Sequence, residues 1–235
     1  MKKMMLMLLT VGMFAACSSC HFDYKQESRI TESRKHVKDF EKIEMLGSMD
    51  VTYMQGDSFE VKVEAPKDVV DKVETEVKNH KLLIRMKGTN HLFHFGNASS
   101  DDVKVTVMSP DLIGVKLNGS GDFECVGLLD TDVLDINLVG SGDVEFKNVI
   151  CDQINVKLVG SGDVDVEKVR TLMSTMELVG SGDIKMKFDD AKMVDARLVG
   201  SGDITLYGNV ETFTSSAHGS GELNIDKLKV MNNKK

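Results

Sequence analysis

The feature of this sequence that could most readily do chemistry is a ladder of aspartates. Gly-Ser-Gly-Asp occurs five times, and its last four copies follow one another at steps of 20 residues. Carboxylates and carbonyls are the ligands that Ca²⁺ prefers, so cations could sit between neighbouring repeats. We favour the alternative, in which aspartate follows glycine because it satisfies backbone groups and stays solvated. The aspartates of the four evenly spaced copies are Asp143, Asp163, Asp183 and Asp203, and Asp122 ends the copy before them.

Other reactive residue types lack the partners that their chemistry needs. The glycine-rich phrase resembles a phosphate-binding loop, but neither a lysine nor a helix follows it. The repeated serines have no histidine and aspartate in a context typical of a nucleophile. His91 and His94 have no evident third metal ligand, so a loop with an apolar tip is the favoured interpretation. We therefore predict no catalytic residue, no metal site and no cofactor.

Composition excludes one class of partner. The 235 residues carry a net charge of -8, whereas nucleic-acid binding needs a basic face. The same charge disfavours electrostatic docking on anionic lipid. Cys125 falls at an apolar position and is expected to be a buried thiol, and its pairing with Cys151 is left open.

The first residues predict export. Lys2-Lys3 precedes the apolar segment Met4–Met13, which is too short to span a bilayer because spanning takes about 20 residues. Residues 1–16 are therefore interpreted as a signal peptide. Phe14-Ala15-Ala16-Cys17 resembles a bacterial lipobox, which implies a lipid on Cys17 and an outer-membrane lipoprotein facing either the surface or the periplasm. Residues 17–37 are then a lipidated cysteine and a flexible tether.

The repeat determines the expected architecture. A coil of about 20 residues cannot bury its own apolar face, but stacked coils can. We therefore predict an all-β protein, a single-chain right-handed parallel β-helix, since parallel crossovers prefer that hand. A flat β-sandwich-like solenoid is the alternative. The Gly-Ser-Gly triplets begin at Gly119, Gly140, Gly160, Gly180, Gly200 and Gly219.

Alternation of apolar and polar residues predicts the register of the coils. It runs through both glycines of each copy, which predicts one strand bent at its middle. A second stretch, such as Lys147 to Asn155, would return the chain. Gly47-Ser48-Met49-Asp50-Val51 reads as a degenerate copy, so the array begins near residue 40.

Stacking in register predicts columns of equivalent residues. The inward columns are Phe123, Val144, Val164, Ile184, Ile204, Leu223 and Cys125, Phe146, Val166, Met186, Leu206, Ile225; an outward column is Lys116, Asn137, Lys157, Glu177, Arg197, Ser216. Every inward member is apolar, and the central charges of the outward column alternate in sign, as favourable neighbours should.

We divide the chain into a signal peptide (1–16), a tether (17–37), a β-solenoid domain (38–230) and a tail (231–235). Within the solenoid, a first coil lies near 40–64, an irregular insert at 65–112 and the regular repeats at 113–226. The stretch from Pro66 to Lys72 is expected to form a turn or two of helix.

The candidate interaction surface is the outward part of the repeated phrase. An apolar stripe of valines runs beside serines and aspartates, and such a stripe could bind a partner or be covered by the returning chain. The residues are Val139, Ser141, Asp143, Val159, Ser161, Asp163, Val179, Ser181, Asp183, Val199, Ser201 and Asp203.

The Gly-Ser-Gly-Asp ladder, the strand at Gly47–Val51 and the lipobox together resemble the family of the putative auto-transporter adhesin, head GIN domain, over about residues 38–230. The resemblance implies export, a β-helix and adhesion, and it brings no catalytic residues. The expected function is a non-catalytic envelope lipoprotein, an adhesin that binds an unidentified protein or glycan. A carbohydrate-binding or carbohydrate-active β-helix and a structural envelope component are alternatives, and the oligomeric state is left open.

Overall fold

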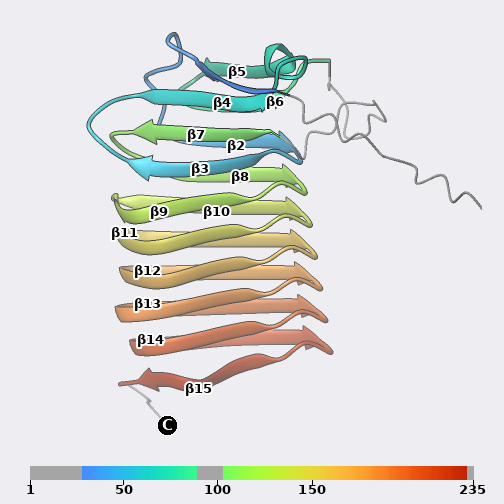
Figure 1. Ribbon diagram of the computed structural model, residues 1–235. Helices are drawn as coiled ribbons and strands as arrows, with labels where there is room; N and C mark the ends of the chain where they lie inside the picture. The colour runs from blue at the N-terminus through green and yellow to red at the C-terminus, as the bar shows by residue number, and fades with distance from the viewer. Residues whose placement is uncertain (1–27, 89–102, 232–235) are drawn as a thin grey trace, which may run out of the picture.

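The computed structural model describes residues 28–88 and 103–231, which are almost entirely β-strand (Figure 1). Cys17, Cys20, His91 and His94 lie outside these ranges. No helix in the described ranges is long and apolar enough to cross a membrane. The strands are β1 Arg29–Ser33, β2 Lys42–Gly47, β3 Asp50–Gln55, β4 Glu60–Pro66, β5 Val73–Lys78, β6 Lys81–Met86, β7 Lys104–Ser109, β8 Gly114–Gly119, β9 Phe123–Asp130, β10 Val133–Gly140, β11 Val144–Gly160, β12 Val164–Gly180, β13 Ile184–Gly200, β14 Ile204–Gly219 and β15 Leu223–Val230.

The strands form a β-solenoid with two layers, which confirms the predicted fold class. In each coil the chain runs along one sheet, turns and returns along the other (Figure 1). The first sheet contains β3, β9, the first halves of β11 to β14, and β15. The second contains β2, β8, β10 and the second halves of β11 to β14. Successive coils pair in parallel at a step of 20 residues, with Leu138 beside Leu158 and Leu158 beside Leu178.

The repeated phrase is a corner between the two sheets, and the prediction of a strand bent at the glycines was wrong. β10 ends at Gly140 and β11 begins at Val144, so Ser141 to Asp143 are outside any strand. Conversely, the stretch assigned to the return, Lys147 to Asn155, lies within the continuous strand β11. The alternation of apolar and polar residues predicted the wrong strand. Because a glycine has no side chain, the sequence does not show where the pleat of the strand is interrupted.

Close stacking of the corners explains why they contain glycine. A Cβ atom on Gly160 would overlap the backbone carbonyl of Gly140, and one on Gly162 would overlap that of Gly142. Gly160 also has φ +141°, a conformation that other residues rarely adopt. The degenerate copy is confirmed, because Gly47 pairs with Gly119 in the neighbouring coil.

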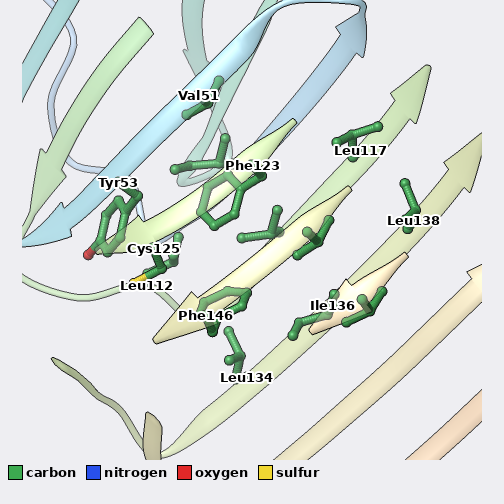
Figure 2. Close-up of a cluster of buried hydrophobic side chains, with 14 of the residues drawn as sticks. Val51, Tyr53, Leu112, Leu117, Phe123, Cys125, Leu134, Ile136, Leu138 and Phe146 are labelled. Carbon is green, nitrogen blue, oxygen red and sulfur yellow. The ribbon is translucent and has the colours of Figure 1, made fainter. Parts of the chain in front are cut away.

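The predicted inward columns are confirmed as the core. The pairing places Val144 beside Phe123 and Val164, and Phe146 beside Cys125 and Val166. Of these columns, only the last members, Leu223 and Ile225, are partly exposed at the C-terminal end. Figure 2 shows Tyr53, Phe123 and Phe146 from the first sheet facing Leu117, Ile136 and Leu138 from the second.

The insert at 65–112, together with β4 from the end of the predicted first coil, builds the N-terminal end of the solenoid. β6 and β7 add a further pair of strands parallel to β2 and β3, and β5 and β4 then pair antiparallel with β6 and β7. The expected helix is a single 3₁₀ turn, Val70–Lys72.

The tether assigned to residues 17–37 needs a correction in its described part. Arg29–Ser33 forms β1, antiparallel to β4. Its side chains are mostly exposed, so the segment has no apolar period that could reveal it as an edge strand.

Single alanine substitutions test whether the corners depend on backbone stacking. Gly162→Ala should cost about 3 kcal/mol of stability, at the upper end of the usual cost of overpacking, because the overlapping atom belongs to backbone that cannot repack. Gly127→Ala is the matched control, since Gly127 has φ +90° but open space around it, and it should cost about 1–2 kcal/mol from backbone strain alone. Urea midpoints measure both effects. Equal losses in the two variants would refute the stacking explanation.

Candidate functional site

The predicted interaction residues are brought together along one edge of the solenoid, which we call the corner ridge: Val139, Val159, Val179 and Val199 with Ser141, Ser161, Ser181 and Ser201. The valines pair in register from coil to coil. Val139 is 41% exposed, the other three valines are half-buried, and all four serines are exposed. The described part of the chain therefore leaves the ridge open to solvent and does not cover it.

The aspartates of the repeat form a hydrogen-bonded ladder between coils. The backbone N–H of Asp163 donates to Oδ1 of Asp143 (3.0 Å), and that of Asp183 donates to Oδ1 of Asp163 (2.9 Å). The same contact joins Asp203 to Asp183 (2.9 Å). Each carboxylate thus accepts a hydrogen bond from a backbone amide of the next coil. That amide lies in the corner, outside the strands that pair in the sheets.

The ladder continues beyond the four regular copies. The N–H of Asp143 donates to Asp122 (3.0 Å), and the N–H of Asp122 donates to Asp50 (3.3 Å). At the other end, the N–H of Glu222 donates to Asp203 (2.7 Å). The sequence analysis favoured aspartates whose carboxylates accept hydrogen bonds from turn backbone. In the structure, the donating amides belong to the next coil.

The column of like charges affects protonation within the ladder. Partial desolvation, together with the neighbouring carboxylates of Asp122 and Asp163, raises the pKa of Asp143, and the hydrogen bond from the Asp163 backbone opposes the rise. Within residues 28–88 and 103–231, no group of three or more His, Cys, Asp or Glu is arranged to hold a metal ion. Calcium binding by the ladder stays the alternative that the sequence analysis did not favour.

A polar groove that the sequence interpretation missed lies on the outer face of the second sheet. It encloses about 520 Å³ between two outward columns. In one column Asn155 donates to Asp135 (2.8 Å) and Thr175 donates to Asn155 (2.7 Å). In the other, which the sequence interpretation had found, Lys157 pairs with Glu177 (3.1 Å). The same 20-residue step, applied to Asp135, would have revealed the first column.

The edge opposite the corner ridge is partly apolar. Leu172, Met173 and Met193 are 46%, 39% and 47% exposed there. Cys151 lies in β11 near this edge, buried, with its Sγ 3.6 Å from Oγ1 of Thr171. Cys151 and Cys125 are both free thiols, and burial raises the pKa of Cys125 to about 12. Cys125 is therefore protonated at neutral pH and chemically inert.

Solved structures with the same fold include two that are described as putative adhesins and one that is described as a putative lipid binding protein. A putative adhesin from Bacteroides fragilis is 24% identical over 84% of this chain and 97% of its own, with a TM-score of 0.65. A putative adhesin from Parabacteroides distasonis is 22% identical over 85% of this chain and 97% of its own (TM-score 0.56). A protein from the same species, described as a putative lipid binding protein, is 22% identical over 85% of this chain and 97% of its own (TM-score 0.53). No curated protein matches the sequence significantly.

The fold defines a two-layered β-solenoid of stacked 20-residue coils with an open corner ridge. The family model of the putative auto-transporter adhesin, head GIN domain, matches residues 39–167 and 165–234. The chain belongs to this family. Membership supports a binding role and a location outside the cell or at its surface.

Substitutions of Asp143 test the ladder by their pH dependence. A raised folded pKa means that the native state holds the proton more tightly than the unfolded chain, so this group's contribution to stability falls as pH rises through the folded pKa. Asp143→Asn keeps the acceptor without the charge. It should exceed the wild type in urea midpoint at pH 7 and match it near pH 3.

Asp143→Ala removes the acceptor for the Asp163 amide and should lose about 1–2 kcal/mol at either pH. Asp226→Asn, at an exposed position outside the ladder, is the control and should show neither effect. A wild-type advantage over Asp143→Asn at pH 7 would contradict the assigned electrostatics.

Proposed function

We propose that the chain is a non-catalytic lipoprotein of the cell envelope, an adhesin that binds a protein or glycan partner through the corner ridge. The observation that carries the proposal is the ridge itself: four valines in register, open to solvent beside four exposed serines. Contiguous apolar surface with polar neighbours is typical of interaction sites.

Rigidity supports this use of the ridge. The glycine contacts and the aspartate ladder fix each corner to the next at about 4.8 Å, so the valines and serines are presented at a constant interval. A surface that is already ordered loses little conformational entropy on binding. The aspartates accept backbone amides through Oδ1, and Asp143, Asp163 and Asp183 remain exposed, so a partner would contact the valines and serines with these carboxylates beside them.

Sequence features support the anchor. The lipobox-like Phe14-Ala15-Ala16-Cys17 follows a signal-peptide pattern, and acylation of Cys17 with several chains would hold the protein at an outer membrane because one chain binds only marginally.

The polar groove on the second sheet favours one alternative, a carbohydrate-binding function. Its hydroxyl, amide and carboxylate groups are of the kind that orient a polar ligand. Its groups are largely hydrogen-bonded to one another, so we rank the groove below the ridge.

Protease treatment of intact cells tests the anchor and the exposure together. The wild-type protein should be membrane-bound and cleaved by added protease. Cys17→Ala should be released from the membrane fraction, since it removes the acylated thiol, whereas Cys20→Ala should behave as the wild type. Retention of Cys17→Ala in the membrane would refute the lipid anchor.

Adherence of cells that display the full chain tests the ridge. Val159→Lys combined with Val179→Glu removes the apolar stripe while placing opposite charges on neighbouring coils, a pairing that a sheet tolerates. Binding to mucin-coated or collagen-coated plates should fall about tenfold or more, equivalent to about 1.4 kcal/mol. Leu172→Lys with Met193→Glu, on the opposite edge, is the matched control. Undiminished adherence of the ridge variant at equal surface levels would contradict the proposal.

A further inference from the structure

A basic hollow lies on the outer face of the first sheet, near the C-terminal end of the solenoid. It encloses about 310 Å³ and extends over β12 to β15. Its polar and aromatic lining consists of Asp165, Glu167, Lys185, Lys187, Tyr207 and Lys227. The hollow is on a sheet face and not at a corner, so it is separate from the ridge.

An aromatic ring interrupts a charged column at this point. The column runs through Lys187, Tyr207 and Lys227 on successive coils, and Glu167 of the coil before them lines the same hollow. Lys187 and Lys227 thus flank Tyr207 by one strand spacing each, about 4.8 Å. Nζ of Lys227 lies 5.5 Å from the centre of the Tyr207 ring. Tyr207 is partly exposed, whereas Tyr53 is fully buried in the core.

Two of the lysines that line the hollow have no acidic partner in the described part of the chain. Asp165 pairs with Lys185 (2.8 Å), and Glu167 pairs with Lys147 at its edge (2.9 Å). In the described part of the chain, neither Lys187 nor Lys227 forms an ion pair, and both are exposed. This cationic excess stands out on a chain whose net charge is -8.

We propose that the hollow binds a sugar ring that carries an anionic group, such as the carboxylate of a uronic acid. Tyr207 would contact the apolar C–H groups of the ring, as aromatic side chains do in ligand sites. Lys187 and Lys227 would pair with the anion as point charges. An acidic polysaccharide would present such a ring at each successive unit. This site goes beyond the ridge function and does not depend on it.

Calorimetric titration of the full chain with the galacturonate trisaccharide tests the site. The acidic sugar should bind, and its fully methyl-esterified form should not, since esterification removes the anion but keeps the ring. Lys187→Gln combined with Lys227→Gln should weaken binding about tenfold, as expected for two exposed charges. Tyr207→Ala should weaken it similarly, and Tyr207→Phe should stay within about twofold because it keeps the ring.

Lys104→Gln is the charge control, because Lys104 is exposed on β7 near the other end of the solenoid. A sulfated disaccharide and inorganic phosphate form two further arms, in which sulfated sugar binding through the same three residues also supports an anionic-sugar site. Phosphate binding as tight as that of the sugar, equal binding of the neutral ester, or full binding by Tyr207→Ala would each overturn the proposal. Absence of binding by every acidic sugar would overturn it as well.

Discussion

Backbone stacking at the Gly-Ser-Gly corner is the contact on which the rest of the structure depends. Each coil can pair in register with the next only if the two backbones approach at the corner without an intervening Cβ atom, and the contacts of Gly160 and Gly162 show that no other residue fits. Once the corners are in register, the apolar columns meet and form a continuous core. The aspartate ladder completes the corner, because it supplies an acceptor to an amide that the sheet does not satisfy.

This constraint separates the residues that build the fold from those that are free to bind. Glycine and aspartate in the repeat make contacts that hold the neighbouring coil, whereas valine and serine beside them face solvent without such a role, and most of the aspartates are exposed as well. The residues of the outward columns on the sheet faces are also free to bind, since the stacking of the coils needs neither a particular residue type nor a particular charge there. The polar groove and the hollow around Tyr207 both lie on such columns. Regularity therefore stabilises the scaffold, and departures from it, such as Tyr207 in a charged column, mark places where binding can be specific.

Period and alternation were enough to predict the solenoid, the membership of the columns and the degenerate copy at Gly47, because stacking in register makes all three follow from one 20-residue step. They could not locate the corner, since Gly140 and Gly142 lack the side chains that would show the pleat ending. They also missed β1, whose exposed residues carry no apolar period, and the hollow at Tyr207, which forms from side chains of four strands. Of the candidate site, the sequence predicted the composition of the ridge but left its exposure to solvent open.

Amide hydrogen exchange, measured by NMR on the full chain in EDTA, tests most directly whether stacking between coils and not a bound cation holds the corners. We expect the backbone amides of Asp143, Asp163, Asp183 and Asp203 to exchange as slowly as those of the buried strands around them, because each donates to a carboxylate of the preceding coil. Fast exchange at these four amides, or protection that develops only after Ca²⁺ is added, would contradict a corner held by the ladder alone.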